Sequence, residues 1–474
     1  MADGTFNPSR CVIKKAELIP YGQENNGTPK DIKDMIGQFS IQQSITSVSL
    51  VGTLTVLDNI GLLQNWPLRA EEELKLEIFC FDLQTTIKLN CQIIKIQSID
   101  IKEDIQGMVY DLQWIGKTSY EAGKRSVIKA FIDKPASSIV VDLFKQYFSQ
   151  LTKATDVNEN NLPEGTIVYN IANDPGRKLY VEETKKNMSV TIPDYMPSQA
   201  IGFVANRAFS SKRSQTASLF RFFENFDGFY FVSDEWLYEY AKKLNIAKKM
   251  EYRPFVNLDG ANPLEQINGL TTFSNNRRSD VGEELMGGSY YNTVVEIDIL
   301  RRTCIRHDYS YLKQLKKEEF NDVTGNKATL DTDTHSEKFI KETFTPENAR
   351  QFYLIKDYSD RVGAYRPDAQ IRELTARRNM FARHAASTQC SATTAGRLDI
   401  QAGQIINILM REATPGTQEK QHSQLSGEYL VHGVNHLVED GQLVTALNLS
   451  KYGFAGAGAD KRRVQAKKFT GKFV

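Results

Sequence analysis

Apolar and polar residues alternate in short runs near the start of the chain. In residues 48–59, Val48, Leu50, Leu54 and Val56 share one face, and serine and threonine occupy much of the other. A period of two residues is typical of a β-strand with one buried face. Three further segments show this pattern: 73–81, 86–96 and 108–115. Several short strands joined by turns predict a barrel or sandwich in this first region.

Strand patterns return near the end of the chain. Three segments are predicted as strands: 398–408, 426–436 and 443–452. The second of them places His432, Val434, His436 and Val438 on one face. Two antiparallel strand blocks in one chain indicate a part of an assembly more than an enzyme.

Between these blocks the period changes to that of helices. After Pro135, the residues Ile139, Val140, Leu143 and Phe144 recur at helical spacing. Two more helices are predicted, one after Pro197 and one over residues 369–384. Two apolar runs around an Asp-Gly pair predict a hairpin over residues 219–232. The middle of the chain is therefore expected to be an α+β insert.

Composition narrows the class of protein. A chain of 474 residues is too long for one core, so two to four domains are expected. Hydrophobic residues make up 41% and charged residues 25%, which is ordinary for a globular protein, and the net charge of +1 argues against a nucleic-acid binder. No run of about 18 apolar residues occurs, so no membrane span is expected. The start of the chain has no apolar core of signal-peptide length, so synthesis and folding in a cytoplasm are expected.

Cysteine and histidine offer little chemistry. The five cysteines include no C-x-x-C pair, which argues against a disulfide scaffold and a thiolate zinc site. We find no nucleotide-binding, zinc-protease or serine-hydrolase motif. His432 and His436 share a strand face but stand about 13 Å apart, too far for one metal ion, so packed histidines are favoured. No catalytic, cofactor or metal site is therefore predicted.

Two other polar groupings have a functional and an ordinary interpretation. Asp331, Asp333 and His335 have oxygen and imidazole ligands at a spacing that can hold a divalent cation, but solvated loop side chains are the favoured interpretation. The acidic run 71–73 is interpreted as a solvated strand edge that discourages unwanted pairing.

The end of the chain is basic. It follows a run of alanine and glycine and is predicted not to fold by itself. A solubilising end, a partner contact that orders on binding and a phosphate contact remain open. If it is an interface, its candidate residues are Lys461, Arg462, Arg463, Lys467, Lys468 and Phe469.

Three stretches together resemble a known family. Residues 52–63 followed by 72–76 are similar to the first barrel of the central baseplate hub proteins of contractile-tailed, myovirus-type bacteriophages. Residues 223–233 resemble a hairpin of the same hubs, and 398–408 with 427–436 resemble their second barrel. The order of parts also fits, and similar hubs form part of contractile injection system spikes.

This resemblance implies a fold and a division of the chain. The expected fold is mainly β with an α+β insert and two tail-tube-like antiparallel β-barrels. The expected regions are a first barrel over 1–118, an α+β insert over 119–255, a second barrel over 256–310 and 390–454, a polar insert with a helix over 311–389, and a flexible basic tail over 455–474.

The resemblance also implies a role without catalysis or cofactors. Three subunits would form a ring of six barrels that adapts the hexameric tail tube to the trimeric central spike and encloses a channel. The implied partners are two further copies of the chain, the tail tube protein and the central spike protein, with tape measure and baseplate wedge proteins as further candidates and genome DNA in transit. The implied location is the virion tail baseplate. The alternative from another class is a tail-associated peptidoglycan hydrolase.

Overall fold

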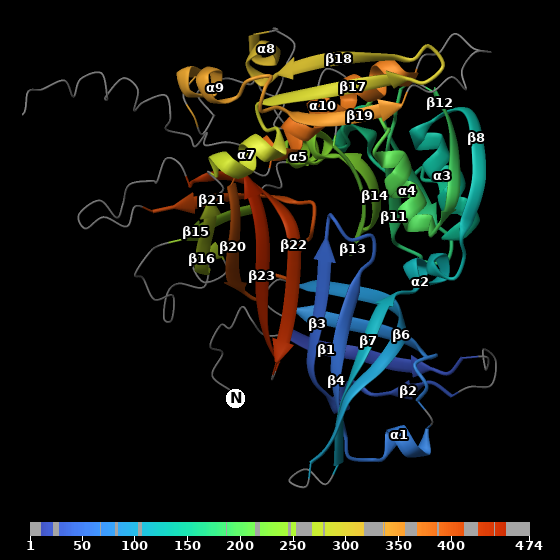
Figure 1. Cartoon of the computed structure of the whole chain (residues 1–474). Coiled ribbons are helices and arrows are strands. Elements are labelled where there is room, and N and C mark those ends of the chain that lie inside the picture. The colour runs from blue at the N-terminus through green and yellow to red at the C-terminus, as the bar shows by residue number, and fades with distance from the viewer. Residues whose placement is uncertain are drawn as a thin grey trace, which may run out of the picture.

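The structure is a computed structural model of the whole chain. It describes residues 11–21, 28–66, 68–80, 84–102, 107–185, 187–213, 219–244, 248–252, 268–277, 280–316, 335, 337–355, 367–385, 388–411, 425–439 and 441–451. The fold is mainly β, and most of it belongs to one 13-stranded sheet (Figure 1).

One half of the large sheet comes from the start of the chain. We call this group the first module, and its strands lie in the order β3-β4-β7-β6-β5-β1, with the short β2 beyond β1. Its elements are β1 (Cys11–Ile19), β2 (Lys30–Asp31), η1 (Lys33–Met35), β3 (Ile36–Ser44), β4 (Val51–Asp58), α1 (Leu62–Asn65), β5 (Glu73–Cys80), β6 (Thr85–Lys102) and β7 (Gly107–Gly116).

The other half comes from the second part of the chain. In this second module the order is β16-β20-β23-β22-β21-β15. Its strands are β15 (Lys248–Tyr252), β16 (Leu270–Arg277), β20 (Thr388–Ala395), β21 (Ile405–Met410), β22 (Gly427–Glu439) and β23 (Gln442–Lys451). Strands β22 and β3 pair, so the two modules form one continuous sheet (Figure 1).

The two modules have the same strand order. Numbered within its own module, each sheet runs 2-3-6-5-4-1 once β2 is left aside. All neighbouring pairs are antiparallel in both modules, apart from the last pair of the second module. There β1 pairs antiparallel with β5, whereas β15 pairs parallel with β21. Two segments far apart in the chain have therefore folded into nearly the same topology.

Each module curls around its own apolar core. The first core includes Leu54, Leu76, Leu112 and Trp114, and the second includes Ile408, Tyr429 and Leu447, in each case buried on the inward face of alternating strands. The expected closed barrels are not seen among the described strands, because no continuous ladder joins the last strand of a module to its first. In the second module the two ends approach each other, since a single bridge links Glu251 to Gly269. In the first module, β1 instead contacts the β22–β23 turn of the second module, where Cys11 N donates to Gly441 O over 3.2 Å.

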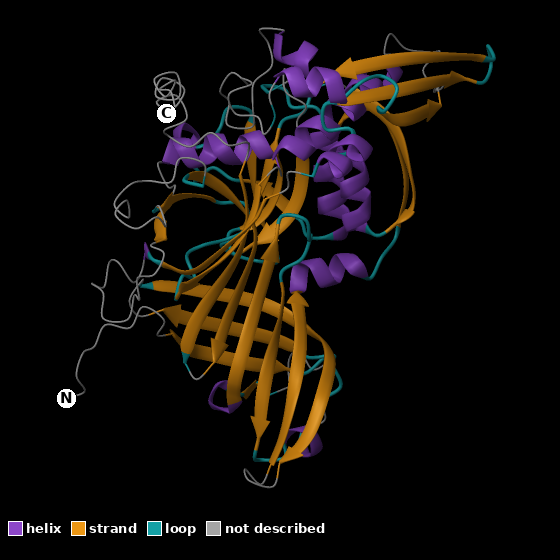
Figure 2. Ribbon diagram, turned by 60° about the vertical axis from the view of Figure 1, so that its left-hand side comes forward, coloured by secondary structure: helices purple, strands orange, loops and turns teal. Residues whose placement is uncertain are grey.

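The insert follows the first module and lies beside both modules (Figures 1 and 2). A five-stranded sheet of order β13-β14-β11-β10-β9 and the pair β8–β12 pack with its helices around a third core. Its elements are α2 (Lys117–Gly123), β8 (Val127–Pro135), α3 (Ala136–Tyr147), β9 (Leu151–Lys153), η2 (Glu159–Asn161), β10 (Thr166–Ile171), β11 (Lys178–Glu182), β12 (Asn187–Tyr195), α4 (Pro197–Ala205), β13 (Phe220–Asn225), β14 (Gly228–Ser233) and α5 (Asp234–Leu244).

A smaller unit interrupts the second module between β16 and β20. Its three-stranded sheet has the order β18-β17-β19 and projects from the body (Figure 2). Its elements are α7 (Val281–Gly287), β17 (Tyr291–Asp298), β18 (Thr303–Ser310), α8 (Tyr311–Lys316), α9 (Glu337–Thr343), β19 (Arg350–Ile355) and α10 (Pro367–Ala385). Strands β17 and β18, which we expected in the second barrel, pair here, and β15, which we expected in the insert, pairs with β21. The division into domains otherwise stays a proposal.

Most elements expected from periodicity are present, with three local differences. The strand expected over 398–408 begins only at Ile405, because the preceding residues form turns that bury Leu398 and Ile400. A register shift at His432 breaks the strict alternation expected in β22. Helix α5 was missed, although Ser233 before two acidic residues is a recognisable helix start, and the Ser233 hydroxyl accepts from Trp236 N over 3.3 Å.

Candidate functional site: the seam between the modules

The seam is the ladder through which β22 and β3 join the two modules. Strand β22 uses one edge twice: its first residues pair with β21, and the segment from Gly433 opposite Ser44 to Glu439 opposite Gln38 pairs with β3. At the far end of the ladder, Val438 is buried in the first core. The end of the β22–β23 hairpin thus completes the core of the other module.

The two modules match in register as well as in strand order. Across four strands of the second module, Val431, Leu449, Cys390 and Asn275 stand opposite one another. In the first module the corresponding set is Ile93, Trp114, Gly52 and Ile41. Directly after these positions, the fifth strand of each module shifts register, at His432 in β22 and at Ile94 in β6.

A second register shift is shared. Strand β16 shifts against β20 at Thr271, which lies four residues before Asn275. Strand β3 shifts against β4 at Gly37, which lies four residues before Ile41. A β-bulge is a local insertion that bends a strand at one position. Two bulges at matching positions show that the modules share their detailed geometry.

The β13–β14 hairpin fastens the insert to the first module. Glu224 is fully buried, and its carboxylate accepts hydrogen bonds from Leu50 N over 3.0 Å and from the Ser119 hydroxyl over 2.8 Å. It also pairs with Arg177 at 2.8 Å. A Cβ on Gly116 would lie 2.9 Å from Glu224 Oε1, so only glycine leaves room for this carboxylate.

Arg177 is the centre of the buried charges behind this contact. Its guanidinium pairs with Asp174 at 2.8 Å and donates to the carbonyl of Asn225 over 2.6 Å. Burial by itself lowers the pKa of Arg177, but the carboxylates of Glu224 and Asp174 outweigh burial and raise the pKa above its ordinary value. A buried charge is tolerated because its partners are in place.

The turn of the same hairpin contacts the second module. Asn225 Nδ2 donates to the carbonyl of Ala402 over 3.2 Å, and Phe226 N donates to Gln401 Oε1 over 3.1 Å. The Phe226 ring stacks on His436, with centroids 5.7 Å apart. One hairpin of the insert therefore holds both modules at the seam.

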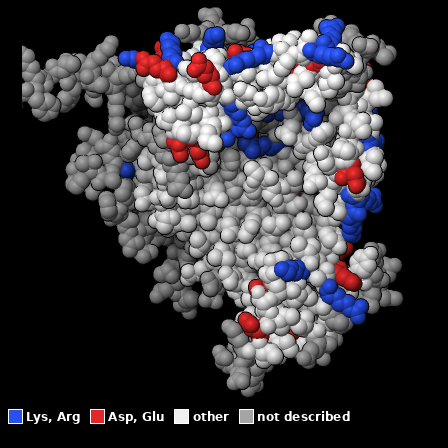
Figure 3. Space-filling view, viewed as in Figure 1, with Lys and Arg blue, Asp and Glu red and all other residues white. Residues whose placement is uncertain are grey.

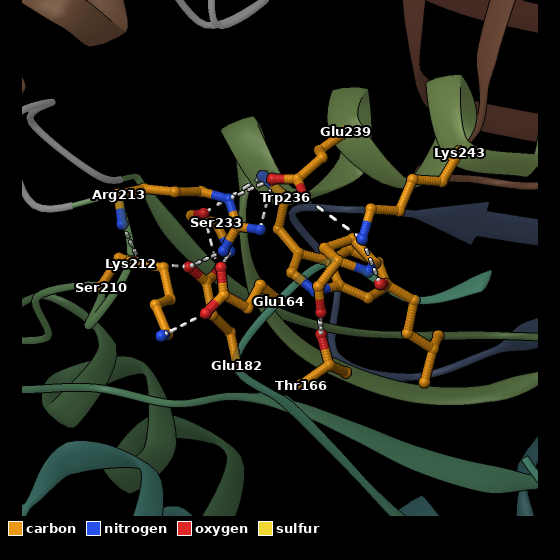
Figure 4. Close-up of polar contacts among 12 residues, drawn as sticks. Glu164, Thr166, Glu182, Ser210, Lys212, Arg213, Ser233, Trp236, Glu239 and Lys243 are labelled. Atoms are coloured by element: carbon orange, nitrogen blue, oxygen red, sulfur yellow. Dashed lines mark hydrogen bonds and ion pairs between the residues drawn. The ribbon is translucent and has the colours of Figure 1, made fainter. Parts of the chain in front are cut away.

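A second buried network braces the hairpin from the insert side (Figure 4). Glu182 is fully buried and accepts hydrogen bonds from the Ser210 hydroxyl over 2.5 Å and from the Ser233 hydroxyl over 2.7 Å. Arg213 pairs with Glu182 at 2.9 Å and with Glu239 at 2.5 Å. Because Ser233 ends β14 and Glu239 lies on α5, the network ties the hairpin to the helix that follows it.

A cavity of about 630 Å³ lies next to this network and is lined in part by Lys153, Glu164, Lys212 and Lys243. Two lysines of its lining have acidic partners: Lys212 pairs with Glu164, which also lines the cavity, and Lys243 lies 3.9 Å from Glu239 of α5 (Figure 4). Both ion pairs lie in parts of the insert that surround the cavity.

Over β3, β4, β7, β20 and β23, the sheet face that points away from the two cores is nearly uncharged, whereas on β6 the same face carries Lys95 opposite Gln113 and Asp100 opposite Val109. In β3, β4, β7, β20 and β23 this face carries Gln38, Ser40, Gln42, Thr53, Thr55, Val109, Asp111, Gln113, Gln389, Ser391, Thr393, Val444, Ala446 and Asn448. Asp111 is the one charged side chain in this set, and it accepts from the Thr55 hydroxyl over 2.7 Å. Figure 3 shows charged side chains gathered over the upper part of the molecule, with few over β22 and β23.

The candidate residues from the sequence fall in different places. His436 is buried and its Nδ1 lies 3.1 Å from the Thr445 hydroxyl, while burial lowers the pKa of His432 to about 4. His335 contacts Glu284 at 2.7 Å, whereas Asp331 and Asp333 lie outside the described residues. In the part of the chain that the structure describes, no cluster of three ligating residues forms a metal site.

Two further candidates from the sequence are the acidic run 71–73 and the basic tail. The acidic run was expected to be solvated, but Glu72 is buried and its carboxylate accepts from Arg69 N over 2.8 Å and Glu71 N over 3.0 Å. It caps the turn before β5, which is the reason for its burial. The basic tail residues, from Lys461 to Phe469, all lie outside the described residues, so their proposed contact stays a prediction.

Two matching strand modules, joined in one sheet and fastened by a hairpin of the insert, define a mainly β, two-module fold. The fold is similar to that of the tail protein from Neisseria meningitidis MC58, with a TM-score of 0.50, 9% identity, and 94% of this chain and 98% of that chain covered. At this identity the likeness shows a shared fold. The chain therefore has the fold of a tail protein.

Two other solved structures are similar over most of this chain. The 43 kDa tail protein of prophage MuSo2 from Shewanella oneidensis has a TM-score of 0.46 and 8% identity, with 92% of this chain and 97% of that chain covered. The Francisella PdpA–VgrG complex has a TM-score of 0.43 and 10% identity, with 94% of this chain and 58% of that chain covered.

No protein-family profile matches the sequence, and no curated protein sequence matches it. Within the described residues, every helix is too short or too polar to cross a bilayer.

Proposed function

We propose that this chain is the structural baseplate hub of a contractile phage tail. In this role three copies form a ring that adapts the hexameric tail tube to the trimeric central spike. The observation that carries the proposal is the match in strand order and bulge positions between the two modules of one chain. Two similar modules in each subunit give three subunits six similar parts, which lets a threefold object meet a sixfold one.

The shared fold supports the same assignment. The Neisseria protein of this fold is a tail protein, and we assign the present chain to the same class of assembly. The expected location is the virion, and the role is structural and without catalysis. We retain the view that each module is a tube-like barrel, completed at its open side by a neighbouring module as Val438 completes the first core.

The uncharged face of the sheet supports a channel. A wall of serine, threonine, asparagine and glutamine side chains does not bind phosphates as lysine and arginine do, because no counterions are released on contact. We therefore assign the face that carries Ser40, Thr53 and Ser391 to the lumen, where DNA or an extended protein can pass without being held. The insert and the smaller unit then lie on the outside of the ring.

Oligomeric state tests the proposal. Light scattering of the purified chain alone should give a mass three times that of the chain, and mixtures with the tube and spike proteins of the same phage should give heavier complexes that contain three copies of it. The Lys461–Phe469 segment is proposed to contact one of these partners, so removing it should weaken a partner complex and leave the trimer. A chain that remains a monomer at micromolar concentration with both partners present would contradict the hub. Clearing of a cell-wall zymogram by the isolated chain would instead support the hydrolase alternative.

A further inference from the structure

One edge of the first module is only partly occupied. Strand β7 covers one edge of β6, but β5 covers the other edge only as far as Gln92. The following segment, residues 94–102, has no strand partner on that side among the described residues. Three of its side chains are exposed although they are apolar: Ile94 at 45%, Ile99 at 52% and Ile101 at 78%.

A second open edge lies at the other end of the continuous run of strands. Strand β16 pairs with β20 on one side, and on its other side the Glu251–Gly269 bridge ends just before Leu270. Six strands lie between β16 and β6 in the order β16-β20-β23-β22-β3-β4-β7-β6, and β5, β1 and β2 follow β6. The two open edges are therefore separated by the whole run within one copy.

The matching strand order and register identify the equivalent strands of the two modules. Strand β6 corresponds to β22 and β16 corresponds to β3, because each holds the same place in its module. Inside the chain, the second half of β22 pairs with β3 at the seam. If the equivalent strands make the same contact, the second half of β6 pairs with β16. Since the two edges are far apart in one copy, the β16 that meets β6 belongs to another copy.

The exposed isoleucine has a buried counterpart at the seam. Counting from the matched bulges, Ile101 corresponds to Val438, since these residues stand opposite Met108 and Leu443 respectively. Val438 is 5% exposed because the first core of the same chain covers it, whereas Ile101 is 78% exposed. An apolar residue that is buried at one seam and exposed at the equivalent place marks a contact that the single chain does not complete.

We propose that residues 96–102 of β6 pair antiparallel with β16 of a second copy of this chain, and that Ile101 enters the second core of that copy. This inference rests on the ring of the proposed function and names the edges that close it. In the transferred register, Asp100 stands opposite Ser274 of the neighbouring copy, as Leu437 stands opposite Ser40 within the chain. The contact is head-to-tail, and a head-to-tail contact closes a ring when the rotation between copies returns to the start, which the proposed threefold ring requires.

Cysteine cross-linking tests the register directly. In a Cys304→Ser background, which removes the exposed thiol, the double variant Asp100→Cys/Ser274→Cys is oxidised and run on a non-reducing gel. Directly opposed strand residues lie about 4.5–5.5 Å apart at Cα, which is within disulfide range. We expect covalent dimers and trimers. The pair Leu437→Cys/Ser40→Cys is the positive control and should cross-link within one chain.

Asp100→Cys combined with Thr393→Cys is the negative control, because Thr393 lies on β20, one strand further away. If the Asp100/Ser274 pair fails to cross-link while the positive control forms and light scattering shows a trimer, the seam assignment is wrong and the hub stands. If the unmodified chain is monomeric under all conditions, the hub and this contact both fail.

A second variant avoids thiol chemistry. Ile101→Glu places a charge where the contact requires an apolar side chain, so we expect loss of the trimer without loss of the fold, since Ile101 is largely exposed in the single chain. Ile132→Glu on β8 is the matched control, because Ile132 is also 78% exposed but lies in the insert. Trimerisation of Ile101→Glu at the level of the unmodified chain would overturn the proposal.

Discussion

Replacing Glu224 with glutamine should loosen the insert from the first module. The substitution keeps the size of the side chain but removes its charge and turns one of its two acceptor oxygens into a donor. In the native protein Oε1 faces Arg177 at 2.8 Å, and Oε2 accepts from Leu50 N and the Ser119 hydroxyl. The new amide group must therefore face either a guanidinium or a backbone N–H, both of which are donors.

The expected cost follows from burial. Glu224 is 0% exposed and Arg177 is 7% exposed, so solvent does not replace the lost partner. Removing one member of a buried ion pair costs about 3–5 kcal/mol. Asp174 still pairs with Arg177, which places the expected loss at the lower end, about 3 kcal/mol.

Hydrogen exchange is the suitable assay, because a chain with several cores need not unfold in one step. The Leu50 amide donates to Glu224, so its exchange reports local opening of this contact. A loss of about 3 kcal/mol corresponds to a roughly 10²-fold fall in protection. Glu121→Gln is the matched control: it is the same change in a solvent-exposed pair with Lys124, where it should alter exchange at Leu50 very little.

A second substitution separates charge from packing. Arg177→Met combined with Asp174→Asn in the Glu224→Gln background removes the buried cation together with its remaining carboxylate partner, so part of the lost protection should return. Unchanged exchange at Leu50 in Glu224→Gln would refute the reasoning, and so would an equal loss in Glu121→Gln.

Two other predictions concern stability. Burial lowers the pKa of His384 to about 4, so the unfolded chain takes up a proton at higher pH than the folded chain. The folded state therefore loses stability as the pH falls from about 6.5 towards 4. The melting temperature of His384→Leu should vary less over this pH window than that of the unmodified chain. An equally steep pH dependence in the variant would contradict the buried neutral histidine. Gly228 has a φ of +139°, and a Cβ there would lie 1.9 Å from Lys178 O. Gly228→Ala should therefore cost at least about 2 kcal/mol and lower the melting temperature. Gly123→Ala is the control and should leave the melting temperature unchanged, because there is open space around its Cβ. Equal melting temperatures for the two alanine variants would show that the hairpin tolerates a side chain at this turn.

Periodicity and turn residues were enough to predict the local elements. Alternation in residues 48–59 predicted β4, and the Asp-Gly pair predicted the β13–β14 hairpin, because these patterns reflect which face of a segment is buried and which residues accept turn conformations. The mainly β fold with an α+β middle followed from such patterns. The resemblance to hub proteins agreed with the fold, although none of its three stretches was distinctive alone.

The way in which the elements combine depends on contacts between residues far apart in the chain. Glu224 contacts Leu50 across 174 residues of sequence, and β15 pairs with β21, which begins more than 150 residues later. Every residue except proline offers the same backbone N–H and C=O groups, so periodicity does not predict which strand edges pair. The seam between β22 and β3 and the matching bulges at Thr271 and Gly37 therefore became visible only when the strands were placed side by side.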